Sequence, residues 1–517
     1  NPTVTITPDR TIYAGTTPFK ATITFNEEIF NFTKDDISAT NASVSNLVKI
    51  DNFNYTFDVT ATNPTLDITL NFASDKANDA AGNSNTAASQ VTITRNSLTT
   101  ISSTSATATF TEVDGIDTAS NDISFSDFGI SFADINTTDL QSLIISIPTA
   151  SILDGAKEEW IVNGTAISLN FANGKAIANI TVDGEIYKIT ATINGANSIL
   201  TFEKVSGKMS FAEAKTLVDA MKYNNSSDTP HTTNRVFSVL VNDGLENSNP
   251  SNITISVVAT NDKPVILSGA SANLSETNTA LSTNGPLSVS DLDTTQTVSV
   301  SKVGVVSSGV TDGLISNDTA LLAMLNLNST PVITADSTSG TITWAFNSGS
   351  EYFDYLAVNE VLTLTYTIKA TDSGALDSAT QTIVITITGT NDTPNITGNT
   401  TTALSNATPT NVTGAGELTF VDIDKTDTPM ASFVKATDTS YTAIRASDSS
   451  TFVLNTTAIG KLQDALILNP SNGTWTYALN TTLLNDISDT IIKSGDKIIV
   501  SYKITVADAN GGSVTKD

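Results

Sequence analysis

Aspartate and asparagine residues recur at matching places in two long stretches of this chain, and the ligand atoms they offer are all oxygen. Each stretch opens with an Asn-Asp pair, continues with an Asp-x-Asp, and has a further Asp at the end of a later β-branched run. The members are Asn261, Asp262, Asp291, Asp293 and Asp372 in one stretch, and Asn391, Asp392, Asp422, Asp424 and Asp508 in the other. A hard cation such as Ca²⁺ takes about six to eight oxygens from flexible loops, whereas Mg²⁺ demands octahedral geometry. The pattern therefore predicts Ca²⁺ sites, provided that the fold gathers these side chains.

The Asn-Asp pairs lie between predicted strands. The stretch 259–266 (ATNDKPVI) returns as 389–396 (GTNDTPNI), and the linker residues Asp262 and Asp392 are 130 residues apart. Alternating β-branched runs precede both copies, at 253–258 and 383–388, and such alternation predicts half-buried strands. The Asn-Asp-x-Pro that follows is typical of a turn. Strand, polar hinge and new strand indicate a string of β-domains.

The chain of 517 residues is too long for one core, and we expect four domains. The predicted fold class is all-β: tandem Ig-like or cadherin-like Greek-key β-sandwiches with short helical insertions. The predicted boundaries are 1–96, 97–260, 261–390 and 391–517. A capping box at Ser210–Glu213 predicts a helix over 214–223, with Leu217, Val218 and Met221 facing the sandwich. Shorter helices are expected at 318–325 and 459–466.

Three groups of motifs carry a resemblance to known families. The segments 25–37 and 79–83 of the first domain resemble bacterial Ig-like repeats of large surface proteins. The ending of the second domain, at 241–258, resembles cadherin-like repeats of bacterial adhesins. The third and fourth domains share the Asp-x-Asp, a Gly followed by Trp344 or Trp475, and a strand ending in Asp, and so resemble the VCBS repeat. This resemblance implies a cadherin-like sandwich from a bacterial surface adhesin.

Greek-key topology predicts that the acidic segments meet. Successive strands run in opposite directions, so the incoming linker, the loop after the second strand and the loop before the last strand share one pole. Clustered carboxylates repel unless a cation lies among them. The alternative is that each Asn-Asp and Asp-x-Asp merely caps its own turn.

Some positions depart from the pattern. We expect Glu360 at the opposite pole of the third domain, where it could bridge to Asp392 in the way cadherin-like families join neighbouring domains. The second domain has Asp134, Asn136 and Asp243 but no Asn-Asp in the linker 95–100, so its site should be weaker or absent and its joint to the first domain looser. Glu112 and Glu276 occupy similar early positions and receive no role.

Composition excludes several kinds of chemistry. The chain has 53 acidic and 25 basic residues, for a formal net charge of −28, which disfavours nucleic acid and anionic membranes as partners. With no cysteine and one histidine, His231, it offers no thiolate nucleophile and no His-rich or Cys-ligated metal site. Phosphate-loop, zincin and serine-elbow motifs are missing from the sequence. We therefore expect no enzyme, although a pair of glycosidase carboxylates stays open in so acidic a chain.

The expected function is a structural extender of a bacterial cell-surface adhesin, extracellular, with tandem sandwiches stiffened by Ca²⁺ between domains. One alternative is a subunit of a surface lattice, such as an S-layer or sheath. Another is a carbohydrate-binding module in which Trp160, Trp344 or Trp475 stacks on a sugar, although the positions of Trp344 and Trp475 on predicted strands favour the core for both. The expected partners are calcium and neighbouring domains of a longer polypeptide, with other copies of the chain or surface glycans left open. No run reaches membrane-spanning length.

The last strand of the fourth domain is expected to be truncated. It should begin at Ser513, and only nine residues follow Asp508, whereas sixteen follow Asp372 up to and including Thr388 in the third domain. Either the polypeptide continues, or another copy donates the missing strand.

Overall fold

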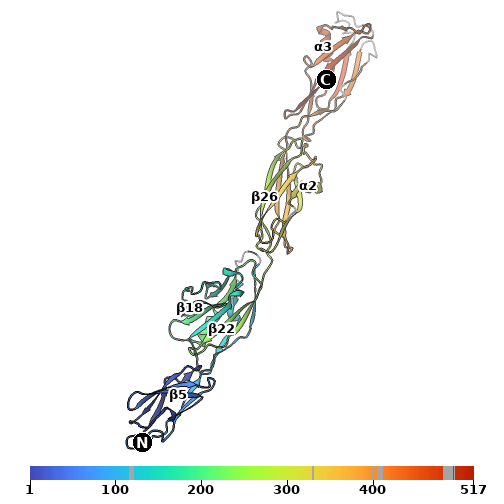
Figure 1. The fold of residues 1–517 in the computed structure, drawn as a ribbon. Helices are drawn as coiled ribbons and strands as arrows, with labels where there is room; N and C mark the ends of the chain where they lie inside the picture. The colour runs from blue at the N-terminus through green and yellow to red at the C-terminus, as the bar shows by residue number, and fades with distance from the viewer. Residues whose placement is uncertain are drawn as a thin grey trace. The chain divides into compact units, whose positions relative to one another are not determined.

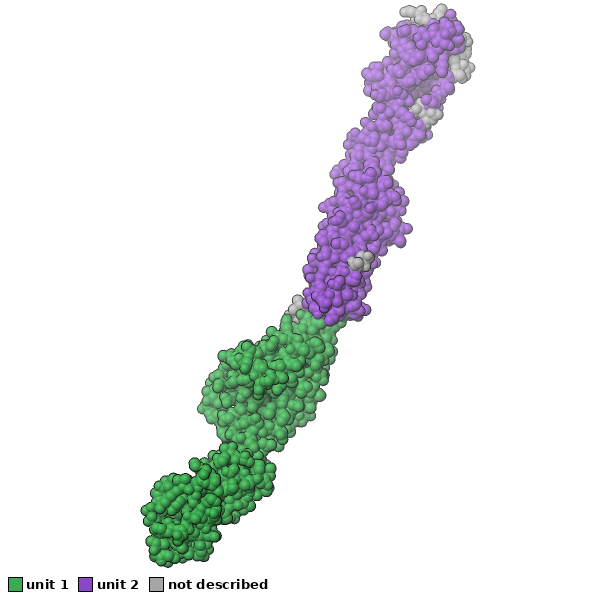
Figure 2. Space-filling model, in the orientation of Figure 1, with its two compact units in different colours: residues 1–261 green, residues 262–517 purple. Residues whose placement is uncertain are grey.

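The computed structural model describes residues 1–517 except 114, 116–120, 329–330, 399–400, 405–410, 481–492 and 494. The chain forms two compact units, Asn1–Asn261 and Asp262–Asp517, coloured green and purple in Figure 2. We call the predicted ranges the first to fourth domains. Five clusters of buried apolar side chains each fall inside one of these ranges, two of them in the fourth. The four boundaries themselves stay a prediction.

The first domain is a sandwich of two four-stranded sheets, ordered β1-β3-β6-β5 and β2-β8-β7-β4. Its elements are β1 (Val4–Pro8), β2 (Ile12–Tyr13), β3 (Phe19–Phe25), the 3₁₀ turn η1 (Lys34–Asp36), β4 (Ile37–Thr40), β5 (Ala42–Lys49), β6 (Asn54–Ala61), β7 (Ile68–Phe72) and β8 (Val91–Arg95). Every second side chain of β3 is buried, as expected for a strand with one face on the core. The chain passes between the sheets in Greek-key fashion, so the predicted fold class is confirmed.

The second domain is larger. A seven-stranded sheet, β10-β23-β22-β14-β19-β18-β17, accompanies a four-stranded one, β11-β21-β15-β16. Its elements are β9 (Thr100–Ser102), β10 (Thr107–Thr111), β11 (Ile123–Ser124), η2 (Phe125–Phe128), β12 (Ser131–Ala133), β13 (Asp139–Leu140), β14 (Ser142–Pro148), η3 (Thr149–Ser151), η4 (Gly155–Lys157), β15 (Glu158–Val162), β16 (Thr165–Ser168), β17 (Ile180–Val182), β18 (Glu185–Asn194), β19 (Asn197–Lys204), β20 (Met209–Ser210), α1 (Phe211–Asp219), β21 (Met221–Asn225), β22 (Arg235–Asn242) and β23 (Ser251–Val258). The capping box at the start of α1 is present. Leu217, Val218 and Met221 are fully buried, as predicted, but α1 ends at Asp219, so Met221 lies in β21 and not in the predicted helix over 214–223.

Buried acids inside the second domain are paired with an arginine. Glu158 and Arg235 are both fully buried, and the guanidinium lies 2.7 Å from Glu158 and 2.8 Å from Asp154. An ion pair of this kind avoids the large cost of leaving a charge uncompensated in the interior. His231 is exposed, and its backbone N–H donates to Asp154 at 3.0 Å.

The third domain has the same strand order as the first, in sheets β24-β26-β29-β28 and β25-β31-β30-β27. Its elements, some labelled in Figure 1, are β24 (Val265–Ile266), β25 (Ala270–Ser275), β26 (Ser282–Ser290), β27 (Val298–Gly309), α2 (Asp318–Met324), β28 (Leu325–Leu327), β29 (Ser339–Asn347), β30 (Val361–Asp372) and β31 (Gln381–Thr388). Strand β25 pairs in parallel with β31, and β10 pairs in parallel with β23 in the second domain. This pairing brings the residues after β10 and β25 beside the linker that leaves each domain.

The fourth domain departs from this plan. Its described strands form sheets β33-β39-β38, β35-β41-β42, β37-β36-β40 and β32-β34. Its elements are β32 (Asn395–Ile396), β33 (Asn411–Glu417), β34 (Phe420–Val421), β35 (Met430–Ser432), β36 (Thr439–Ile444), β37 (Thr451–Phe452), α3 (Thr456–Asp464), β38 (Leu466–Leu468), β39 (Thr474–Asn480), β40 (Lys497–Tyr502), β41 (Ile504–Ala507) and β42 (Ser513–Lys516). The run that ends at Asp508, predicted to be one strand, is thus two strands in different sheets, β40 and β41. Helix α3 starts earlier than predicted because the Asn455 side chain caps it, accepting from the Ala458 N–H at 2.9 Å.

The tryptophans of the third and fourth domains lie against glycines on the neighbouring strand. Gly285 pairs with Trp344 and Gly416 with Trp475. Trp160 and Trp344 are only 1% and 4% exposed, which contradicts the alternative in which they stack on a sugar and confirms the expected core position of Trp344. Trp475 is partly buried. In the described ranges, no helix is both long and apolar enough to cross a membrane.

Gly285→Ala should destabilise the third domain. A Cβ at this position would lie 2.9 Å from the Trp344 ring, which is buried and must shift. Overpacking of this kind costs about 1–3 kcal/mol. We expect faster hydrogen–deuterium exchange in β26 and β29 of the whole chain. Gly304→Ala is the matched control, because a Cβ there meets nothing within 4 Å; equal exchange in the two variants would contradict the packing argument.

Candidate metal centre

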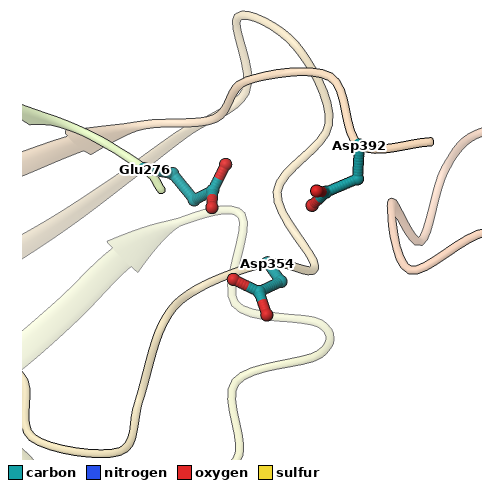
Figure 3. A group of neighbouring side chains, drawn as sticks. All are labelled: Glu276, Asp354 and Asp392. Atoms are coloured by element: carbon teal, nitrogen blue, oxygen red, sulfur yellow. The ribbon is translucent and has the colours of Figure 1, made fainter. Parts of the chain in front are cut away.

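Three carboxylates from separate segments come together between the third and fourth domains. Glu276, Asp354 and Asp392 each place one oxygen within 4.8 Å of the others. Figure 3 shows them where the end of a strand, a loop and a linker meet. Glu276 is fully buried and Asp392 is 8% exposed. One oxygen of each of the three has no hydrogen-bond partner.

Glu276 is positioned by the parallel pairing of β25 with β31. It follows β25 directly, and its N–H donates to the Thr388 carbonyl at 2.8 Å. Its Oε2 accepts from the Thr390 hydroxyl at 2.6 Å, which leaves Oε1 without a partner. The Thr390 contact holds the carboxylate against the linker that enters the fourth domain.

Asp354 is presented by a strained loop. The preceding residue, Phe353, is buried and has a backbone φ of 65°, which is unfavourable for any residue other than glycine. Burial, and then the charges of Glu276 and Asp392, raise the pKa of Asp354 to about 6. The loop thus holds a carboxyl group in a place where its ionised form is disfavoured.

Asp392 links this cluster to the pole of the fourth domain. Its Oδ1 accepts from the Asn278 side chain at 2.8 Å, and its N–H donates to Asp424 at 2.8 Å. Asp424 is 1% exposed, and its Oδ1 has no hydrogen-bond partner. Burial, and then the charges of Asp392, Asp422 and Asp427, raise the pKa of Asp424 to about 7.

A second group of carboxylates lies at the same pole. Asp422, Asp427 and Asp508 each place one oxygen within 4.8 Å of the others. Asp508 accepts from the Asn391 side chain at 3.1 Å, while the Asn391 side-chain oxygen has no partner. The predicted set Asn391, Asp392, Asp422, Asp424 and Asp508 is therefore brought together, and Asp427 joins it.

The pole of the third domain gathers four acids that are almost fully buried. Asp262, Asp291, Asp293 and Asp372 are 1%, 2%, 4% and 5% exposed. The Asp262 N–H donates to Asp293 at 2.7 Å. Burial, and then the charges of Asp372 and Asp262, raise the pKa of Asp291, whose Oδ2 has no hydrogen-bond partner. Asn261 is the last residue of the other compact unit and is not assigned to this group.

The structure does not place Glu360 in the cluster, so the predicted bridge to Asp392 is wrong. One Glu360 oxygen accepts from the Ala357 N–H at 3.0 Å and the other from the Thr426 hydroxyl at 3.0 Å. Glu360 contacts the fourth domain, but through a neutral group. Glu276 and Asp354 take the place expected for it.

Sequence reasoning missed three acids: Glu276, Asp354 and Asp427. Glu276 directly follows β25, and Glu112 directly follows β10 at the matching place of the second domain, which was a usable signal. Glu112 accepts from the Thr260 N–H at 2.6 Å, as Glu276 does from Thr390. Asp354 and Asp427 have no counterpart in the motif, and only the tertiary structure reveals them.

The pole of the second domain holds Asp134, Asn136 and Asp243, as predicted from their spacing. All three bond to the linker: Thr99 donates to Asp134 at 2.9 Å, Asn136 to the Arg95 carbonyl at 2.9 Å, and Asn96 to Asp243 at 2.7 Å. The side chains converge, but protein donors already surround them.

The fold and the acidic poles define a chain of all-β sandwiches with carboxylate clusters at their ends. Residues 1–95 match the family described as the bacterial Ig-like domain. No curated protein matches the chain.

Similar solved structures include two bacterial adhesins and a set of cadherin-like domains. The Escherichia coli adhesin FdeC is 12% identical, with 75% of this chain and 97% of that one covered and a TM-score of 0.18. The adhesive subunit CfaE of enterotoxigenic Escherichia coli is 10% identical, with coverages of 55% and 98% and a TM-score of 0.20. The zebrafish RET cadherin-like domains 1 to 4 are 10% identical, with coverages of 68% and 66% and a TM-score of 0.18. Values this low establish neither a shared family nor a shared function.

The clusters should make stability fall with rising pH when cations are removed. The pKa of these carboxyl groups is higher in the folded state than in the unfolded state, where it is about 4. Each group therefore stabilises the fold fully at a pH below its unfolded pKa. This contribution is lost as the pH rises through the folded pKa. For Asp354 and Asp424 those values are about 6 and about 7. We expect calorimetry of the whole chain in chelator to show a lower unfolding temperature at pH 8 than at pH 5. The double variant Asp354→Asn, Asp424→Asn should reduce the difference, and an unchanged slope would refute this origin.

Proposed function

We propose that this chain is a spacer segment of a bacterial cell-surface adhesin, and that Ca²⁺ locks the joint between its third and fourth domains. The observation that carries the proposal is the convergence of Glu276, Asp354 and Asp392 with one unpartnered oxygen each. These residues come from a strand end, a loop and the interdomain linker. An ion held by all three would tie the two domains together.

The donor set fits Ca²⁺. The cluster and the neighbouring pole offer carboxylate oxygens and the amide oxygen of Asn391, with no nitrogen or sulfur ligand among the described residues of either group. Oxygen-only sites on flexible loops suit Ca²⁺. The bound ion would supply positive charge to both groups, Glu276, Asp354 and Asp392 in one, and Asp422, Asp427 and Asp508 in the other.

Burial elsewhere in the chain supports this interpretation. Where the second domain buries Glu158, it places Arg235 beside it at 2.7 Å. At the joint between the third and fourth domains, Lys425 pairs with Asp312 at 2.6 Å, outside the cluster. The acids of the joint therefore depend on a charge that the described side chains around them do not provide.

The spacer role follows from what the site can do. A site whose ligands come from two domains stiffens the joint between them, and the match of residues 1–95 to bacterial Ig-like domains supports a bacterial surface protein. A lattice subunit would instead assemble when Ca²⁺ is added. Light scattering that shows Ca²⁺-induced assembly of the chain would favour that alternative.

Asp354→Asn should weaken Ca²⁺ binding by at least about ten-fold, or roughly 1.4 kcal/mol, because it removes one of three charged ligands. Isothermal titration calorimetry on the whole chain measures the loss. Because Ca²⁺ would bind the folded state and not the unfolded state, it should also raise the unfolding temperature. At a Ca²⁺ concentration 100 times Kd, the free energy of unfolding would rise by about 2.7 kcal/mol.

Glu360→Gln is the matched control. It removes an acid of the same joint whose oxygens bond to Ala357 and Thr426 rather than to the cluster. We expect wild-type affinity. If Asp354→Asn and Glu360→Gln behave alike, or if the wild-type chain takes up no Ca²⁺, the proposed site is wrong.

A further inference from the structure

The pole of the second domain repeats the backbone geometry of the two Ca²⁺ candidates. In each pole the N–H of the linker residue that follows the Asn donates to the last residue of the Asp-x-Asp or Asp-x-Asn loop. The pairs are Ser97 with Asn136 at 3.3 Å, Asp262 with Asp293 at 2.7 Å, and Asp392 with Asp424 at 2.8 Å. Asn96 likewise donates to Asp243 at 2.7 Å, as Asn391 does to Asp508 at 3.1 Å. The three poles therefore share one arrangement of linker and loop, which we call the socket.

The socket of the second domain has two fewer carboxylates than the socket of the fourth domain. Ser97 stands where the fourth domain has Asp392, and Asn136 stands where it has Asp424. A hydroxyl and an amide replace two negative charges, so this socket gains much less from a cation than the others.

Each oxygen of the two remaining carboxylates, Asp134 and Asp243, accepts a hydrogen bond from the protein. Asp134 accepts from the Asn136 N–H at 2.9 Å and from the Thr99 hydroxyl at 2.9 Å, one on each oxygen. Asp243 accepts from the Leu245 N–H at 2.7 Å on one oxygen and from Asn96 on the other. At the other poles, by contrast, oxygens of Asp291, Asp422 and Asp424 have no hydrogen-bond partner.

Arg95 supplies a positive charge at this joint. It ends β8, the last strand of the first domain, and its guanidinium lies 2.7 Å from Glu246 in the second domain. The same group donates to the carbonyls of Pro64 and Asn96. Its side chain is 19% exposed and that of Glu246 24%, so solvent screens the pair only in part.

We propose that Arg95 is a built-in cation that closes the joint between the first and second domains, and that this joint is independent of Ca²⁺. The guanidinium is permanently charged and planar, and its donors point in fixed directions. Two carbonyl acceptors, one from a loop and one from the linker, orient it, and the Glu246 carboxylate of the next domain lies in ion-pair contact with it. A chelator cannot remove it. The proposal concerns this joint alone and stands whether or not the joint between the third and fourth domains binds Ca²⁺.

The joints can be compared within one molecule by distance measurements. The chain has no cysteine, so pairs of spin labels can be placed on engineered cysteines. Lys49→Cys with Lys175→Cys spans the first joint, and Ser308→Cys with Ser447→Cys spans the last; all four positions are exposed. Double electron–electron resonance then gives the distribution of distances across each joint, with Ca²⁺ and with chelator.

We expect the distribution across the first joint to be equally narrow with Ca²⁺ and with chelator. Arg95→Ala should broaden it under both conditions, and Glu246→Gln should do so from the opposite side of the contact. Arg10→Ala is the matched control, since Arg10 pairs with its neighbour Asp9 at 2.9 Å within the first domain, and it should leave the distribution unchanged. Hydrogen exchange of β3 and β6 checks that the first domain stays folded in each variant.

Broadening of the wild-type first joint in chelator would overturn the proposal. So would a distribution that stays narrow in both Arg95→Ala and Glu246→Gln. The label pair across the last joint reports on the Ca²⁺ proposal separately, so failure of either idea is visible without the other.

Discussion

The poles of this chain hold like charges close together and away from water, at a cost in free energy that the rest of the structure must offset. Glu276 is fully buried and Asp424 is 1% exposed, and each has further carboxylates as neighbours. Burial and mutual repulsion both disfavour ionisation, which is why the pKa of Asp354 and that of Asp424 are raised. A β-sandwich could avoid this cost by placing neutral residues at its poles. The first joint does so, with Ser97 and Asn136, and the last joint does not.

The arrangement of strands explains how distant residues reach one place. Parallel pairing of β25 with β31 sets Glu276 beside the outgoing linker, and the Greek-key path returns the Asp-x-Asp loop and Asp508 to the end where that linker arrives. The sheets therefore act as a frame, and the chemistry lies in the loops at their ends. The same arrangement of sheets can therefore carry either a cluster of acids or an ion pair in the loops at its ends.

The two kinds of joint represent two solutions to the same mechanical problem. In our proposals, an arginine gives a contact that does not depend on the medium, whereas a cluster of carboxylates would make a joint whose stiffness follows the cation concentration around it. In the second domain, Arg235 beside Glu158 shows the same arginine solution used within a core. A chain that combines both could keep one joint firm while another responds to its surroundings.

Local pattern was enough to predict the strands, the all-β class and the capping box of α1, because alternation, turn residues and capping are properties of neighbouring residues. It also predicted that the Asn-Asp and Asp-x-Asp segments meet, since Greek-key topology places alternate loops at one pole. The exchange of Glu360 for Glu276 and Asp354 was decided by tertiary structure. The side chain of Glu360 accepts hydrogen bonds from Ala357 and Thr426, and an oxygen of Asp354 lies within 4.8 Å of the Glu276 and Asp392 carboxylates. The contacts of Arg95 could not be predicted for the same reason, because its partners Pro64 and Glu246 are 31 and 151 residues away in the sequence and only folding brings them to it.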